Sequence, residues 1–446
     1  MRVILLKHLN RLGRKQTALL ATGILVLSVP CFLSSQGLAL DSKQELTIEL
    51  PPPSTNERAP TRAPTVGAKS AILVDAASGQ ILFERDARRR RPMASTTKIM
   101  TAVLFLEHCK NLKEMVTASK KAACTDNSSL HLKVGERITA RNLLYGMLVR
   151  SANDGSVAAA EHVSGSCAAF VQSMNKKAKS LGALDTHFVN PHGLHDPNHY
   201  STAYDLSLLA RRAIEFGAFN EVVRTRKATI ERSKNKKDLV LFNYSKFLKR
   251  YARADGIKSG YTKQAGRCYV GSATKDGWRL VSVALASPNV ADDTIALMDY
   301  GFNNFKPVIV ARRGEVVGSA AVKGGAAATV PVTAESELHA IVKPGEERKV
   351  TSRLDAAEAQ APVRRGDRMG TMFAHVDGKQ VAAVPIRADA DVGVSLVGIA
   401  FPWLRNGFIL LIGIMVSRKY GAATAKSSGR RRRRVSQEVR GVDRRR

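Results

Sequence analysis

The sequence has few cysteines and little acidic charge, and both shortages limit what the protein can be. Five cysteines among 446 residues are too few for a disulfide scaffold. Only 38 acidic residues face 70 basic ones, which gives a formal net charge of +32. The composition is nevertheless 44% hydrophobic and 24% charged, which excludes a largely disordered chain. The length predicts two or three domains with a sizeable core.

The excess positive charge is concentrated at the two ends of the chain. Residues 1–40 carry +5 and residues 418–446 carry +10, which leaves +17 on residues 41–417. Because nearly half of the excess lies outside the body, nucleic-acid binding is the weakest of the functions that we consider.

The first 40 residues have the three-part pattern of a secretory signal. A basic stretch runs to Lys15, an apolar run extends from Thr17 to Val29, and small residues precede a cleavage point after Ala39. The apolar run has 13 residues, fewer than the ~20 of a membrane-spanning helix. We therefore expect residues 1–39 to be a signal peptide and the body to be exported. An uncleaved N-terminal anchor is the alternative.

A second apolar segment, residues 391–417, lies near the other end. Arg405 interrupts it. Inserting an arginine at the centre of a spanning helix costs ~2.5–3.5 kcal/mol. The basic tail, residues 418–446, follows directly and would stay in the cytoplasm under the positive-inside tendency. We expect membrane attachment through this segment, either as a spanning helix or as an interfacial helix with Trp403 at the headgroup level. The tail suits anionic lipid head groups.

Between the ends, the pattern predicts a linker and two folded domains. Residues 40–66 are rich in proline and predict an extended tether. Residues 67–306 begin with a strand hairpin, continue with helical periodicity and end in further strands, which favours an α+β domain. Residues 307–390 contain only short strand patterns and predict a small all-β domain.

The expected elements follow from these patterns. The expected helices cover 95–109, 142–149, 155–162 and 203–215. The expected strands cover 71–75, 81–83, 239–242, 267–273, 280–285, 308–310, 340–342, 370–376 and 380–386, and an Asp-Gly turn joins the last two.

The sharpest chemical signal is Ser95-Thr96-Thr97-Lys98. Residues three apart in a helix lie on one face, so the serine hydroxyl and the lysine amine are neighbours. The helix N-terminus also offers unpaired backbone N–H groups beside the serine. An isolated Ser-x-x-Lys match is nevertheless more often an ordinary capping serine.

Two further motifs favour a catalytic serine at position 95 over a capping one. Ser151-Ala152-Asn153 follows an apolar helical pattern, and Lys258-Ser259-Gly260 stands at the start of an expected strand. Each alone has an ordinary structural explanation. In this order, after an export signal, they match the pattern of penicillin-interacting serine enzymes: Ser-x-x-Lys, Ser-x-Asn and Lys-Thr/Ser-Gly.

With these motifs the sequence resembles the D-alanyl-D-alanine carboxypeptidases, the low-molecular-mass penicillin-binding proteins. The likeness runs from about Ala71 to Ala388. The similar stretches are 75–79, 92–100, 143–148, 190–194, 200–203 with Asp205, and 255–262. The resemblance implies a β-lactamase/transpeptidase-like catalytic domain, an antiparallel sheet with a helical cluster, followed by the small all-β domain.

The resemblance also implies a role for each motif residue. Ser95 would be the nucleophile, and Lys98 would be its base if the nearby cation of Lys258 keeps it neutral. Ser151 would relay the proton to the leaving amine. The backbone N–H groups of Ser95 and Tyr261 would form the oxyanion hole. The expected substrate-binding residues are Asn153, Lys258, Ser259, Gly260, Tyr261 and Thr262, and neither a metal nor another cofactor is expected.

Some features depart from the family or remain open. Ser259 stands where threonine is commoner. The family often carries Asn-Arg-Asn where this chain has Asn243-Tyr244-Ser245, so its arginine is missing or replaced by Lys246 or Arg250. Three histidines could suggest a zinc site, but the resemblance places them in a loop of a metal-free enzyme: His192, His195 and His199. Four cysteines allow up to two disulfides: Cys109, Cys124, Cys167 and Cys268.

The sequence therefore predicts an exported, membrane-attached serine D-Ala-D-Ala carboxypeptidase in the periplasm or on the outer face of the cytoplasmic membrane. Its expected partners are peptidoglycan stem peptides ending in D-Ala-D-Ala and, as covalent inhibitors, β-lactam antibiotics. The alternatives are a D,D-endopeptidase acting on cross-links and a catalytically silent cell-wall-binding protein. A β-lactamase is disfavoured because the chain has no Glu-x-x-Leu-Asn element.

Overall fold

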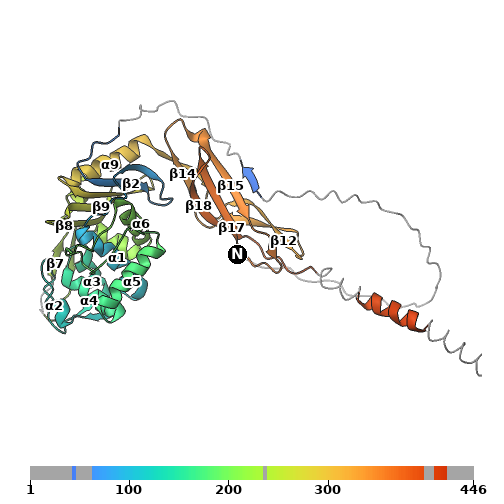
Figure 1. The fold of residues 1–446 in the computed structure, drawn as a ribbon, viewed down its shortest axis with the longest axis horizontal. Helices are drawn as coiled ribbons and strands as arrows, with labels where there is room; N and C mark the ends of the chain where they lie inside the picture. Colours follow the sequence, from blue (N-terminus) through green and yellow to red (C-terminus); the bar gives the residue numbers. More distant parts are fainter. Residues whose placement is uncertain (1–42, 47–62, 235–238, 396–405, 419–446) are drawn as a thin grey trace, which may run out of the picture. The chain divides into compact units, whose positions relative to one another are not determined.

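The structure is a computed structural model that describes residues 43–46, 63–234, 239–395 and 406–418 (Figure 1). The predicted signal peptide, most of the predicted linker and nearly all of the basic tail lie outside the described residues.

The larger domain is built on a five-stranded antiparallel sheet with the order β3-β2-β10-β9-β8. Its strands are β2 (Ser70–Asp75), β3 (Ile81–Arg85), β8 (Ala254–Thr262), β9 (Gly266–Lys275) and β10 (Trp278–Ser287). Strand β8 stands at one edge and pairs with β9 alone, so its other edge can face a ligand.

Both faces of this sheet are buried, and the sequence of β2 shows why. Ile72 and Val74 belong to the core shared with the helical cluster, whereas Ala71 and Leu73 belong to the core beneath α9 (Val290–Asn304) (Figure 1). Successive residues of a strand point to opposite faces, so a strand covered on both sides is apolar throughout. The result is a helix–sheet–helix arrangement in layers.

The helical cluster supplies most of the site. The 3₁₀ turn η1 (Ala94–Thr97) leads into α1 (Lys98–His108), and α3 (Ala140–Leu148) precedes α4 (Asn153–Ser164). The other helices are α2 (Lys120–Ala123), α5 (Cys167–Ser180), α6 (Ala203–Ala213), α7 (Gly217–Arg224) and α8 (Lys246–Arg250). Two small hairpins join them: β4 (Met115–Thr117) with β5 (Arg137–Thr139), and β6 (Lys227–Ile230) with β7 (Leu239–Phe242).

Side-chain caps mark where several of these helices begin. The hydroxyls of Thr139, Ser166 and Thr202 accept from the backbone N–H three residues ahead, at 2.9–3.2 Å. Each cap pairs one of the backbone donors that the first helical turn leaves free. Five helices were not predicted, although Ser166 is such a signal for α5: α2, α5, α7, α8 and α9.

The second domain is all β, as predicted. A seven-stranded sheet has the order β1-β15-β17-β18-β13-β12-β16, and β11 pairs with β14. Its strands are β1 (Lys43–Leu46), β11 (Lys306–Ala311), β12 (Val316–Lys323), β13 (Thr329–Ala334), β14 (Leu338–Val342), β15 (Val350–Ala356), β16 (Ala359–Gln360), β17 (Arg368–Val376) and β18 (Lys379–Ala388). A 3₁₀ turn, η2 (Glu347–Lys349), precedes β15.

Two details of this domain bear on the sequence predictions. The turn between β17 and β18 has positive φ at Asp377 (49°) and Gly378 (73°), the geometry that an Asp-Gly hairpin turn prefers. Strand β1 comes from within the predicted linker and pairs antiparallel with β15. The α+β class with a following all-β domain is confirmed.

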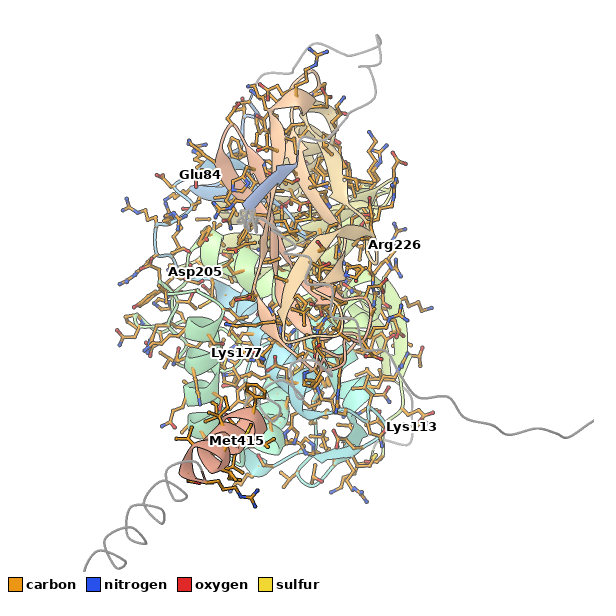
Figure 2. The ribbon with its side chains drawn as sticks, turned by 90° about the vertical axis from the view of Figure 1, so that its right-hand side faces the viewer. Glu84, Lys113, Lys177, Asp205, Arg226 and Met415 are labelled. Carbon is orange, nitrogen blue, oxygen red and sulfur yellow. The ribbon has the colours of Figure 1, made fainter. Side chains whose placement is uncertain are left out.

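Beyond the β domain, residues 406–418 form a helix with exposed side chains, and Figure 2 marks Met415 on it. Within the described ranges, no helix is long and apolar enough to span a bilayer. Elsewhere charged side chains stand outside the ribbon, as Lys113 does in Figure 2.

One ion pair in the larger domain is fully buried. Arg232 Nε and Nη2 donate to the two carboxylate oxygens of Glu136 at 2.5 and 2.9 Å, and Arg232 Nη1 donates to the Leu130 carbonyl at 2.8 Å. Burial by itself would raise the pKa of Glu136, but hydrogen bonds from Arg232 and the Lys133 N–H hold this pKa below its ordinary value. The pair therefore fixes the segment from Leu130 to Glu136.

Removing the carboxylate should leave the Arg232 charge buried and unpaired. We expect Glu136→Ala to lower the free energy of unfolding by about 3–5 kcal/mol in urea denaturation. The matched control is Asp185→Asn, which breaks the half-exposed Arg90–Asp185 pair and should cost at most about 1 kcal/mol. Equal losses in the two variants would contradict a structural role for the buried pair.

Candidate active site

The Ser95 side chain sits at the junction of η1 and α1. The predicted single helix over 95–109 is wrong in its first turn, which is 3₁₀. The Thr96 and Thr97 hydroxyls each donate to a backbone carbonyl three residues earlier, at 2.7 Å, and hold this tight turn. As a result the Ser95 Oγ lies 3.0 Å from the Lys98 Nζ.

Lys98 has no exposed surface, and its amine is surrounded by three oxygen atoms. Besides the Ser95 Oγ, the Nζ contacts the Asn153 Oδ1 and the His192 carbonyl oxygen, both at 2.7 Å. Burial lowers the pKa of Lys98 far below its ordinary value, and the charge of Lys258 lowers it further.

These contacts determine what a neutral Lys98 can do. A neutral amine has two N–H bonds and one lone pair. Asn153 Oδ1 and the His192 carbonyl can only accept, so they take the two N–H bonds. The lone pair is then left facing the Ser95 Oγ, where it can accept the serine proton.

Lys258 lies on the edge strand β8 and is 3% exposed. Burial lowers its pKa to about 7, and its Nζ donates to the Ser259 carbonyl at 2.9 Å. Two lysines whose pKa values are both lowered thus share one site, and such perturbed groups mark functional sites.

Gly260 lets β8 pass directly over Ser95. A Cβ atom at this position would lie 2.8 Å from the Ser95 backbone nitrogen and 3.1 Å from that of Thr96. Any larger residue would push the strand away from Ser95, so this close packing requires a glycine at the third position of the Lys258-Ser259-Gly260 motif.

Asn153 contacts Lys98 from the first position of α4. Its side chain is 3% exposed, with Oδ1 on Lys98 and Nδ2 donating to the Asp126 carbonyl at 2.9 Å. Its backbone N–H donates to the Ser128 carbonyl at 2.7 Å. The Asn153 side chain therefore holds Lys98 in this structure, and its expected contact with substrate stays a prediction.

The sequence reasoning gave no role to Asp154, the next residue. Its buried carboxylate accepts hydrogen bonds from the Leu130 and Leu132 N–H groups and from the Ser129 hydroxyl, at 2.6–3.1 Å. It thereby fixes the loop that carries Ser128, a pocket residue. An acidic residue in the first turn of a helix was the available signal.

The histidine-containing loop lies beneath η1 and α1. His199 Nε2 is 2.8 Å from the Thr97 hydroxyl, and the Thr101 hydroxyl donates to the Pro191 carbonyl at 2.6 Å. Burial lowers the pKa of His192 to about 3 and that of His199 to about 4, so both are neutral. These contacts hold the loop against η1 and α1, so that the His192 carbonyl faces Lys98.

A cavity of about 730 Å³ opens over Ser95. This volume suits a small ligand or a peptide end. Five further predicted site residues line it: Ser151, Lys258, Ser259, Gly260 and Tyr261. Ser151 has the left-handed φ of +64°, at the turn between α3 and α4. Thr262 is not among the lining residues of the described chain, and its hydroxyl accepts from the Ala265 N–H at 3.0 Å.

Basic side chains also line this cavity. Lys246 does so, whereas Arg250 forms an ion pair with Asp292 at 2.6 Å. Arg150 and Arg267 line it as well, and sequence reasoning missed both. Arg267 pairs with Tyr261 across β8 and β9, a register that only the folded sheet reveals.

The four described cysteines, Cys109, Cys124, Cys167 and Cys268, are free thiols. The two disulfides that the sequence allowed are therefore not formed in this structure.

Known proteins resemble this chain over both domains. The family model described as D-alanyl-D-alanine carboxypeptidase matches residues 56–289, and the one described as penicillin-binding protein 5, C-terminal domain, matches residues 305–394. D-alanyl-D-alanine carboxypeptidase DacF of Bacillus subtilis is 31% identical over 334 residues, 73% of this chain and 86% of that protein. DacA of Haemophilus influenzae is 30% identical over 360 residues, 76% of this chain and 89% of that protein.

Solved structures agree with the sequence comparison. Penicillin-binding protein 5 from Haemophilus influenzae is 30% identical, with a TM-score of 0.62 over 75% of this chain and 99% of that chain. A peptidoglycan synthesis regulatory factor (PBP3) from Streptococcus pneumoniae is 25% identical, with a TM-score of 0.62 over 74% of this chain and all of that chain. The chain therefore belongs to the D-alanyl-D-alanine carboxypeptidase family.

Proposed function

We propose that this protein is a serine D-Ala-D-Ala carboxypeptidase that removes the terminal D-alanine from peptidoglycan stem peptides through an acyl-enzyme on Ser95. One observation carries the proposal: the amine of the fully buried Lys98 lies 3.0 Å from the Ser95 Oγ at the cavity over Ser95. Family membership supports the substrate class, and this geometry supports Ser95 as the nucleophile and Lys98 as its base.

Acylation begins when Ser95 Oγ attacks the carbonyl carbon of the peptide bond between the two D-alanines. Lys98 Nζ takes the serine proton as the new C–O bond forms. The C–N bond then breaks, and the leaving D-alanine nitrogen receives a proton through Ser151, which lines the same cavity. Water later attacks the ester carbonyl, and the trimmed peptide leaves as its carboxylic acid.

The free edge of β8 suits an extended peptide. An edge strand presents unpaired backbone N–H and C=O groups, with which a substrate backbone can form a further antiparallel strand. The close approach of Gly260 to the Ser95 nitrogen brings this edge to the nucleophile. The N–H groups of Ser95 and Tyr261 are then our proposed oxyanion donors, each contributing ~2.7–4 kcal/mol to transition-state stabilisation.

The terminal carboxylate of the substrate needs positive charge and hydroxyl donors. We assign it to Lys258 and Ser259, and Arg267 on the neighbouring strand adds a second cation at the same cavity. A guanidinium binds a carboxylate through two parallel hydrogen bonds. Arg267 thus offers a replacement for the arginine that the Asn243-Tyr244-Ser245 segment lacks. The role of Thr262 stays a prediction.

The cellular setting follows from the substrate class. We infer that the protein is exported and acts on the bacterial cell wall, as the signal-like residues 1–39 predict. Attachment to the membrane through residues 391–417 stays a prediction, with spanning and interfacial arrangements as its two forms.

The nucleophile can be tested by intact-mass spectrometry with penicillin. We expect the wild-type chain to form one covalent adduct, mapped to Ser95, and to release D-alanine from a stem peptide ending in D-Ala-D-Ala. Ser95→Ala should lose both signals, whereas Ser180→Ala, at an exposed helix end, should keep them. An adduct on folded Ser95→Ala protein would overturn the assignment.

The same samples distinguish the alternatives. Cleavage of a cross-linked dimer peptide faster than of the stem peptide would favour a D,D-endopeptidase. Well-folded wild-type protein that forms no adduct and releases no D-alanine would favour a catalytically silent wall-binding protein.

The pH profile of acylation should report the coupling between the two lysines. Only neutral Lys98 can accept the serine proton, so the rate should rise with pH through the Lys98 pKa. Removing the second cation should raise this pKa, because the protonated amine is then repelled less. In Lys258→Met we therefore expect the acid limb of the pH–rate profile, where the rate rises with pH, to move to higher pH by about one unit or more.

The measurement is the second-order rate of penicillin adduct formation between about pH 5 and about pH 9. The control Lys263→Met removes an exposed lysine five residues away and should leave the limb in place. A Lys258→Met profile that is slower but unshifted would show that Lys258 only binds ligand and does not tune Lys98.

A further inference from the structure

Three side chains outside the active site converge on one point: Cys109, Glu114 and His162. The thiol sulfur, a carboxylate oxygen and an imidazole nitrogen lie within 4.8 Å of one another. Cys109 directly follows α1, His162 lies in the last turn of α4, and Glu114 comes just before β4. Three separate elements therefore meet through these groups.

Two of these atoms are buried without a hydrogen-bond partner in the described chain. They are Glu114 Oε1 and His162 Nε2, which lie 3.9 Å apart. That separation is too long for a hydrogen bond but fits two ligands of one cation. A buried polar atom without a partner is costly, so this pair requires an explanation. A metal ion between them would satisfy both atoms.

We propose that Cys109, Glu114 and His162 bind a divalent transition-metal ion of the zinc class. Thiolate, imidazole and carboxylate are the three protein ligands of Zn²⁺, whereas Mg²⁺ and Ca²⁺ prefer oxygen alone. One thiolate and one carboxylate also neutralise the two positive charges of the ion. On binding, the S–H bond of Cys109 breaks, its proton passes to water and a metal–sulfur bond forms.

The site is also accessible from solvent. Cys109 is 2% exposed, but the side chains of His162 and Glu114 are 25% and 34% exposed. A hydrated ion can therefore enter from the side of these two residues, and a water molecule can supply the fourth ligand of a tetrahedron. Zinc ligands in a tetrahedron lie about 3.3–3.7 Å apart, so the three ligand atoms would approach one another by up to about 1 Å on binding.

The position of this site suggests a structural role. Helices α1 and α4 pack together, and their N-terminal ends carry Lys98 and Asn153, which are joined by a 2.7 Å hydrogen bond. The proposed metal would join the opposite ends of the same two helices, about 15 Å along α1 from Lys98. It would therefore stabilise the helix pair without contacting the reacting atoms.

The test uses the full chain, reduced, stripped of metal with a chelator and returned to chelator-free buffer. Titration with Co²⁺, a spectroscopic substitute for Zn²⁺, should give one equivalent bound and a thiolate-to-cobalt charge-transfer band. Zn²⁺ at about one hundred times its dissociation constant should displace the band and raise Tm by roughly 5 °C or more. The Ser95 penicillin adduct, measured in parallel, should form with and without metal.

The variants identify the ligands. Cys109→Ser should lose the charge-transfer band, and Glu114→Gln, which keeps the thiol, should weaken Zn²⁺ binding at least tenfold. Cys124→Ser removes an exposed cysteine and should behave as the wild type. A missing band in the wild type, or an equal Tm shift in all chains, would overturn the proposal. A lost adduct with an intact band would instead count against the proposed function alone.

Discussion

The burial of one lysine amine is the constraint on which the site depends. Lys98 lies in the first turn of α1 with no exposed surface, and its Nζ contacts two oxygens that can only accept and the Ser95 hydroxyl, which can also donate. A charged amine there would lose its hydration and also face Lys258, so the neutral form is favoured. The chemistry that we propose for Ser95 follows from this, because a weak nucleophile would gain a base one helical turn away.

The fold can be understood as the support for that lysine. Helix α4 brings Asn153 to it, the loop from Asn190 to Gly193 brings a carbonyl, and β8 brings Lys258. None of these contacts is local in sequence, so each relies on a rigid attachment elsewhere. Asp154 and the Arg232–Glu136 pair provide two such attachments, through buried charges whose hydrogen bonds are satisfied within the domain.

Much of the fold was predictable because its hydrophobic pattern is consistent with its elements. The apolar run of β2, the helical spacing of α1 and the Asp-Gly turn between β17 and β18 each carry a local signal. The missed helices α5 and α7 bury only three residues each, so few apolar positions mark them in the sequence. The first turn around Ser95 was also missed, because the Thr96 and Thr97 hydroxyl hydrogen bonds that hold its 3₁₀ form do not change the apolar spacing.

The sequence alone determined the residue types and their order: a serine and a lysine one turn apart, then the Ser151 and Lys258 motifs. It could do so because a spacing of three residues fixes neighbours within a helix. The tertiary structure alone decided which groups meet across the chain. In the fold Asn153 contacts Lys98, and Arg267 lines the cavity. Cys109, Glu114 and His162 lie close together. Those meetings depend on packing and strand register, which bring together residues far apart in sequence and leave no local pattern.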